Sequence, residues 1–162
     1  TSSGQDMKFI VIAVVIGLAI FYFTRNSSNK KLAIENVAIG KEFLATNKAK
    51  EGVVETASGL QYEILQKGDG NDHPSASSMV NVHYHGMLLD GTVFDSSVDR
   101  GEPISFPLNQ VISGWTEGVQ LMVVGDKFRF FIPAELAYGN RATGKIKPGA
   151  LLIFEVELLE IQ

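Results

Sequence analysis

The chain has no cysteine among its 162 residues, which excludes disulfide bonds, thiol nucleophiles and thiolate metal sites. It also lacks a stripe of basic residues interleaved with aromatics, and its net charge is −4. Both features argue against a nucleic-acid partner. The glycines at positions 139 and 144 are followed by neither a Lys-Ser/Thr pair nor a helical pattern, so a phosphate-binding loop is not expected.

One long apolar run stands near the N-terminus, from Phe9 to Phe23. A membrane-spanning helix needs about 20 apolar residues and a signal-peptide core about 7–15, so this run lies between the two. Because no small-x-small cleavage site follows, we expect an uncleaved signal-anchor helix over residues 7–25. A cleaved signal peptide and a buried core helix are the alternatives. Residues 1–6 precede Met7 and are expected to be a tag remnant that takes no part in the fold.

The charges around the apolar run leave two orientations in the membrane. A short Met-Lys leader favours export, whereas Arg25, Lys30 and Lys31 favour keeping the following domain in the cytoplasm. We expect membrane anchoring with the main domain in the periplasm, and a cytoplasmic-facing domain is the alternative. Gly17 alone is weak support for an oligomer driven by the anchor, so no oligomeric state is predicted.

Residues 26–52 predict a helical stalk between the apolar run and the main domain. Ser28 or Asn29 is suited to cap a helix that runs to about Glu51, with Gly52 just beyond its end. The apolar residues of this helix form only a ragged stripe, so we expect a partly exposed helix rather than a core helix.

The remaining residues, 53–162, show the two-residue alternation of strands separated by turns. Apolar side chains alternate over residues 61–66, 80–86, 128–132 and 152–158. Only one short helix is indicated, where Trp115, Val119 and Met122 follow Ser113 at helical spacing. We therefore expect an α+β fold in which a curved antiparallel sheet, a half-barrel, wraps around one short α-helix.

Four motifs occur in order along this domain, namely VHYHG at 82–86, DGTVFDSS at 90–97, VISGW at 111–115 and AYG at 137–139. Their order resembles the FKBP family of peptidyl-prolyl cis–trans isomerases. The segments ASGLQY at 57–62 and FPLNQVI at 106–112 are similar to the bacterial Mip-like branch. The resemblance covers roughly residues 50–162. It implies an α+β fold, isomerase activity without a cofactor or metal, proline-containing polypeptide clients and inhibitors of the rapamycin type.

The resemblance also implies a site. Trp115 would form the floor of a proline pocket, the Tyr138 hydroxyl would donate to a ligand carbonyl, and Asp95 would orient polar groups. The residues expected to act in catalysis are Asp95, Tyr138, Tyr84 and Phe94. Those expected to bind substrate or ligand are Arg100, Phe106, Val111, Ile112, Trp115, Ala137, Ile146 and Phe154.

Taken singly, these residues have ordinary structural explanations. A tryptophan or phenylalanine in such a pattern is more often plain core, and Asp95 before two serines suits a turn. Their joint occurrence in the family's order is what favours a site. His83 and His85 share a strand face, but no third ligand is evident, so solvent-facing histidines are expected rather than a metal site.

The chain departs from the pattern of many family members at Ile104, at Gln110 and in the loop 144–148. These departures bear on substrate preference and macrolide affinity more than on activity. A non-catalytic chaperone or binding module that uses the same pocket is the alternative function, because an apolar pocket can hold proline without speeding its rotation.

Overall fold

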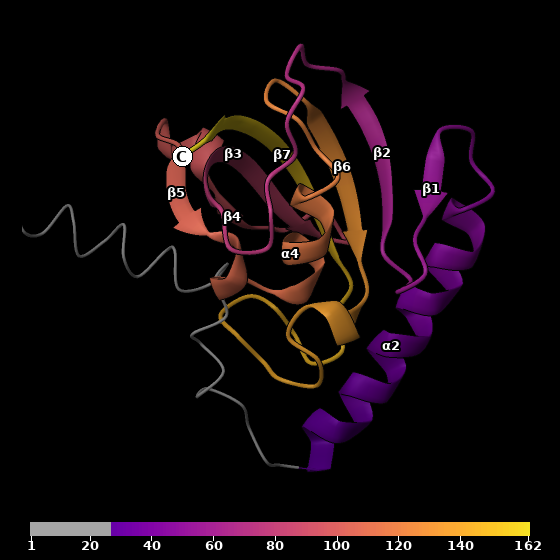
Figure 1. Ribbon diagram of the computed structural model, residues 1–162. Coiled ribbons are helices and arrows are strands. Elements are labelled where there is room, and N and C mark those ends of the chain that lie inside the picture. The colour runs from indigo at the N-terminus through magenta and orange to yellow at the C-terminus, as the bar shows by residue number, and fades with distance from the viewer. Residues whose placement is uncertain (1–26) are drawn as a thin grey trace, which may run out of the picture.

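The computed structural model describes residues 27–162, in which one helix leads into a curved antiparallel sheet (Figure 1). The apolar run at 9–23 lies outside the described residues. None of the helices in residues 27–162 has the length and apolar character that a membrane crossing requires. The helices are α2 (Ser27–Asn47), α3 (Ser97–Arg100) and α4 (Ser113–Val119), with 3-10 turns η2 (Leu108–Gln110) and η3 (Ala134–Leu136).

The sheet has seven strands in the order β1-β2-β6-β7-β3-β4, and β5 also pairs with β3. Every pairing is antiparallel. The strands are β1 (Val53–Glu55), β2 (Gln61–Gln66), β3 (Met79–Leu88), β4 (Val93–Ser96), β5 (Ile104–Pro107), β6 (Lys127–Ile132) and β7 (Leu152–Ile161). The predicted α+β class and antiparallel sheet are confirmed.

The alternation read from the sequence corresponds to burial in β3 and β7, whereas β2, which was expected to alternate over residues 61–66, is buried only at its first residue. Along β3, every second residue from Val80 to Leu88 is buried, and along β7 the same holds from Leu152 to Leu158. These side chains form one core with α4, which lies against the concave side of the sheet (Figure 1). Trp115 and Val119 of α4 are fully buried there. Met122 is fully buried as well, although α4 ends before it.

The prediction of a single short helix missed α3, a one-turn helix that directly follows β4. The Ser96 hydroxyl accepts a hydrogen bond from the Asp99 N–H and so caps its first turn. Gly101, with φ of 76°, ends it in the left-handed conformation. Four residues are too few for a hydrophobic period, so only the capping residues signal such a helix.

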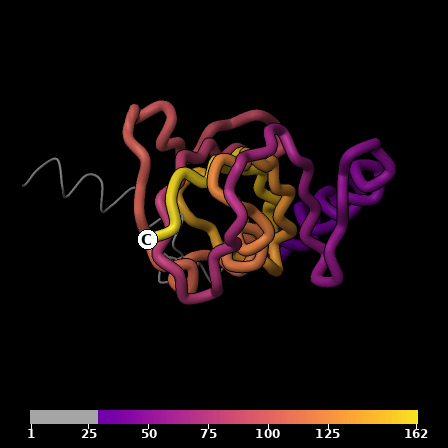
Figure 2. The backbone as a smooth tube through the Cα atoms, turned by 45° about the horizontal axis from the view of Figure 1, so that its top comes forward, coloured from indigo at the N-terminus to yellow at the C-terminus, as the bar shows by residue number. Residues whose placement is uncertain are grey.

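Helix α2 packs against the convex side of the sheet, and Figure 2 shows it at the flank of the barrel. Leu44 is buried against Phe131 and Leu151. The Asn47 amide donates to the Gln61 side chain at 2.8 Å, and both side chains are buried. The helix ends at Asn47 rather than near Glu51, because the chain turns there into β1 through backbone bonds such as Lys50 N–H to the Asn47 carbonyl.

Candidate functional site

Tyr84, Asp95 and Arg100 form a closed triangle of hydrogen bonds in the concave side of the sheet. The Tyr84 hydroxyl donates to Asp95 Oδ2 at 2.6 Å, and Arg100 Nη1 donates to Asp95 Oδ1 at 2.6 Å. Arg100 Nη2 also donates to the Tyr84 hydroxyl at 2.9 Å. A charge-assisted pair of this kind is short and directional, so it fixes the position of the carboxylate.

The local sequence explains how these three side chains meet. Tyr84 lies on the buried face of β3 and Asp95 on the paired strand β4, while the single turn of α3 brings Arg100 back over Asp95. Ser97 fixes the junction, because its hydroxyl accepts from the Tyr84 N–H at 2.7 Å. Ser97 is not among the site residues predicted from the sequence. Its position directly after Asp95 and Ser96 was the available signal.

His83 and His85 are half-buried, and each faces one serine of this junction. His83 Nδ1 lies 2.9 Å from Ser97 Oγ, and His85 Nδ1 lies 2.8 Å from Ser96 Oγ. Their expected solvent-facing position is therefore only partly observed. In the described part of the chain, no group of three or more His, Cys, Asp or Glu side chains is placed to hold a metal ion.

Burial raises the pKa of two groups in the triangle, the Asp95 carboxyl and the Tyr84 phenol. Burial raises the pKa of Asp95 above its usual range, although hydrogen bonds from Tyr84 and Arg100 oppose the shift. Burial and the neighbouring Asp95 carboxylate raise the pKa of the Tyr84 phenol well above its usual value. The Tyr84 hydroxyl therefore stays protonated and remains a donor throughout the physiological range.

An aromatic cluster surrounds Trp115 next to the triangle. The Trp115 ring lies edge-on to Tyr84 at 5.3 Å and to Phe154 at 5.1 Å, with Phe106 at 5.4 Å. Phe94 lies edge-on to Phe154 at 5.3 Å and is only partly buried. The Trp115 Nε1 has no hydrogen-bond partner among residues 27–162, so packing rather than hydrogen bonding holds the indole.

The other predicted site residues pack into the same core. Tyr138, Ile112 and Ile146 are buried, whereas Val111 and Ala137 are partly buried against the cluster. The structure thus brings the predicted residues together in one apolar core, with Arg100 at its polar edge.

One anchor of the site was not predicted. Glu117 lies on α4 two residues after Trp115, and it accepts hydrogen bonds from Thr56 Oγ1 at 2.6 Å and Ser58 Oγ at 2.5 Å. These bonds tie α4 to the turn between β1 and β2. Ser58 belongs to the ASGLQY segment, but nothing in the local pattern connects it with a helix 59 residues further along the chain.

Comparison with known proteins identifies two family profiles along the chain. Residues 70–159 match the profile of the FKBP-type peptidyl-prolyl cis-trans isomerase. Residues 18–64 match the profile of the domain amino terminal to FKBP-type peptidyl-prolyl isomerase. Together the two matches cover both α2 and the sheet that it packs against.

Individual relatives agree with the profiles. The FKBP-type isomerase FkpA of Aeromonas hydrophila is 60% identical over 132 residues, which are 82% of this chain and 49% of the relative. The outer membrane protein MIP of Legionella longbeachae is 47% identical over 85% of this chain and 59% of the relative. The crystal structure of FkpA from Escherichia coli matches with a TM-score of 0.80 at 42% identity, over 84% of this chain and 63% of that one. The chain thus spans about half the length of the curated relatives it matches.

Proposed function

Because the chain belongs to the family of FKBP-type peptidyl-prolyl cis–trans isomerases, we propose that it accelerates rotation about X–Pro bonds in polypeptide clients. The single observation that carries this proposal is the aromatic cluster around Trp115 joined to the triangle of Tyr84, Asp95 and Arg100. It supplies an apolar cradle next to fixed polar groups.

Catalysis of X–Pro rotation requires a pocket of suitable shape and polarity and does not require a nucleophile. Resonance gives the peptide bond a rotation barrier of about 18–20 kcal/mol. The twisted transition state loses amide resonance and its charge separation, so an apolar pocket disfavours it less than the planar ground state. A pocket that fits the twisted bond and donates a hydrogen bond to a neighbouring carbonyl of the client binds the transition state more tightly than the substrate.

The resemblance to the family implies the roles of individual residues, and these roles meet the requirements of the reaction. We propose that the client's proline ring binds among the aromatic side chains of Tyr84, Phe94, Phe106, Trp115 and Phe154. The wall of this pocket is completed by Val111, Ile112, Ala137 and Ile146. Tyr138 is assigned as donor to the client's carbonyl, and Asp95 as the group that orients polar atoms at the edge. Arg100 holds Asp95 in place through the 2.6 Å ion pair. Macrolides of the rapamycin type are expected to compete for the same cradle.

Exchange of a Xaa-Leu-Pro-Phe peptide measures the proposal directly. We expect the chain to accelerate cis-to-trans exchange, and rapamycin to block the acceleration. Asp95→Ala is expected to lower kcat/KM up to about 100-fold, because mispositioned groups at a reacting bond cost that much. Asp99→Ala changes an exposed carboxylate on α3, the helix that directly follows the strand of Asp95, and serves as the matched control.

Two results would distinguish the alternative function. A chaperone or binding module without catalysis would leave exchange at the uncatalysed rate, while rapamycin still quenched Trp115 fluorescence. An Asp95→Ala protein that retained full kcat/KM would remove the triangle from the mechanism.

We further propose that residues 7–25 anchor the protein in a membrane, with 26–52 as a linker and 53–162 as the isomerase domain on the periplasmic side. The apolar run at 9–23 supports anchoring, and one relative is named an outer membrane protein. The protein is expected to stay in the membrane pellet after alkaline carbonate extraction, and external protease is expected to degrade it in spheroplasts. Release into the soluble fraction would refute the anchor, and protection from protease would place the domain in the cytoplasm.

A further inference from the structure

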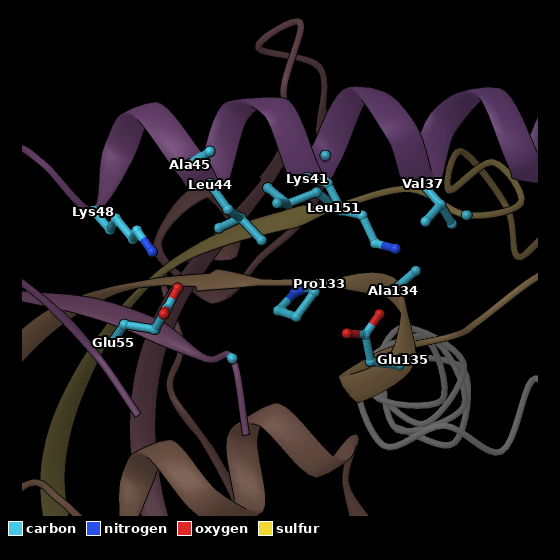
Figure 3. Close-up of a pocket in the computed structure, with 13 residues that line it drawn as sticks. Val37, Lys41, Leu44, Ala45, Lys48, Glu55, Pro133, Ala134, Glu135 and Leu151 are labelled. Atoms are coloured by element: carbon cyan, nitrogen blue, oxygen red, sulfur yellow. The ribbon is translucent and has the colours of Figure 1, made fainter. Parts of the chain in front are cut away.

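Three hollows adjoin one another along one side of α2. One of about 240 Å³ lies between the C-terminal half of α2 and η3 (Figure 3). A second of about 340 Å³ shares Val37 and Lys41 with the first. A third of about 510 Å³ shares Glu135 with the first and Asn140 with the second, and Tyr138 lines it. We call the three together the α2 furrow. It begins beside a residue of the proposed proline site and runs away from it.

The α2 wall of the furrow is one stripe of the helix. Lys30, Ile34, Val37, Lys41 and Lys48 line the three hollows, and their spacings of three, four and seven residues place them on one face. Lys48 directly follows α2, and at 1.5 Å per residue the distance along the helix axis from Lys30 to Lys48 is about 27 Å. All three lysines are exposed, and so is Ile34. The α2 wall therefore carries the apolar residues Ile34 and Val37 between Lys30 and Lys41, with a third cation at Lys48.

The opposite wall comes from the domain. Pro133 and Ala134 lie opposite α2, and Glu55 and Glu135 extend their carboxylates into the space that Lys48 and Lys41 enter from above (Figure 3). Arg141 lines the end near Tyr138. Among residues 27–162, the ion pairs observed are those of Arg100 and Arg129, and none of them joins two charged residues of the furrow. Four cations against two anions leave the furrow positive.

We propose that a client polypeptide whose prolyl bond lies at the proposed site continues along the α2 furrow as an extended strand, and that clients with acidic residues next to proline are preferred. This inference rests on the proposed isomerase function. A length of about 27 Å corresponds to about eight extended residues, far more than a proline and its neighbour. A strand turns successive side chains to opposite sides, so acidic side chains face the lysines of α2 while apolar ones cover Pro133 on the opposite wall.

The furrow also has a route to the proposed site. The Ala134 carbonyl, in the furrow wall, accepts hydrogen bonds from the N–H groups of Ala137 at 2.9 Å and Gly139 at 2.8 Å. These two residues flank Tyr138. A strand bound against Ala134 therefore rests on the same short segment that positions the Tyr138 hydroxyl.

Peptide length and charge test the furrow. The whole chain is assayed by exchange on a Leu-Pro-Phe core, on the core with eight added residues that include two glutamates, and on the same extension with lysines instead. Extensions are placed on the N-terminal side in one set and on the C-terminal side in another. We expect one acidic extension to raise kcat/KM about five- to tenfold over the core, through several exposed charge contacts. The gain is expected to fade near 1 M salt, where the Debye length is about 3 Å.

Charge reversal in the furrow gives the decisive comparison. In Lys41→Glu/Lys48→Glu, the ratio of the acidic-extension rate to the core rate is expected to fall to about one, and the lysine extension is expected to gain. Lys31→Glu/Lys67→Glu makes the same charge change at exposed positions outside the furrow, and its ratio is expected to match that of the original chain.

If the ratio of the acidic-extension rate to the core rate is equal in the original chain and in both double variants, the proposal that clients bind along the furrow is wrong. A change in sedimentation mass on furrow reversal would overturn it too, because the furrow would then be an interface between copies. If the original chain accelerates no peptide, the isomerase proposal fails by itself. Binding of the fluorescein-labelled acidic extension to the original chain and to the furrow variant then still decides whether the furrow holds a polypeptide.

Discussion

Trp115→Ala is expected to lower the free energy of unfolding by about 3–5 kcal/mol, as for other large aromatic side chains removed from a core. Its indole is fully buried, and the rings of Tyr84, Phe106 and Phe154 lie within 5.4 Å of its centroid. Its removal leaves a cavity that three rigid rings cannot fill without leaving their own contacts. The proposed proline cradle would lose its floor in the same step, so isomerase activity is expected to fall as well.

Urea unfolding followed by circular dichroism measures this change. Leu121→Ala is a suitable control because Leu121 follows the same helix and is 37% exposed, so it is expected to lose far less. A domain with a stability of about 5–15 kcal/mol remains folded enough for the comparison. Similar losses for the two variants would show that the aromatic cluster is looser than its ring geometry indicates.

The parts of the fold that the sequence predicted are those with a local period. The alternation in β3, β6 and β7 predicted which side chains face the core, because a strand turns each second side chain to the same face. The meeting of Tyr84, Asp95 and Arg100 was expected only from the resemblance. No period relates a residue of β3 to one on a four-residue helix, and the turn that joins them depends on the caps at Ser96 and Gly101.

The docking of α2 was not predicted, and its contacts explain why. Beside Leu44, several of these contacts come from small or polar residues that carry no hydrophobic pattern, such as Ala33, Asn36 and Gly40. The sequence also shows Phe131 on the face of β6 opposite to the core. Such a large apolar residue on the convex side requires a cover, and α2 provides it. The hydrophobic pattern of the helix alone does not reveal this complementarity.

Gly149→Ala is expected to displace α2 and to destabilise the protein by about 2 kcal/mol or more, since forced overpacking typically costs about 1–3 kcal/mol. A Cβ at this position would overlap the Ala33 carbonyl oxygen and would lie 2.9 Å from the Ala33 Cα. Both are backbone atoms of α2, so no side-chain rotation relieves the contact. The nearby bond from Asn36 Nδ2 to the Pro148 carbonyl, at 2.8 Å, would be strained as well.

Gly144→Ala separates the two sources of this destabilisation. Gly144 has φ of 56° and Gly149 has φ of 74°, so both substitutions force an alanine into the left-handed region, at about 1–2 kcal/mol. A Cβ on Gly144 meets nothing within 4 Å. The excess loss in Gly149→Ala over Gly144→Ala, from thermal unfolding, therefore reports the clash with α2. Hydrogen exchange of the α2 amides is expected to rise only in Gly149→Ala.

Since α2 forms one wall of the furrow and Gly149 lines the other, this variant is also expected to weaken the preference for extended acidic peptides. Equal losses and unchanged exchange in the two variants would mean that α2 rests on the domain too loosely to form a binding wall.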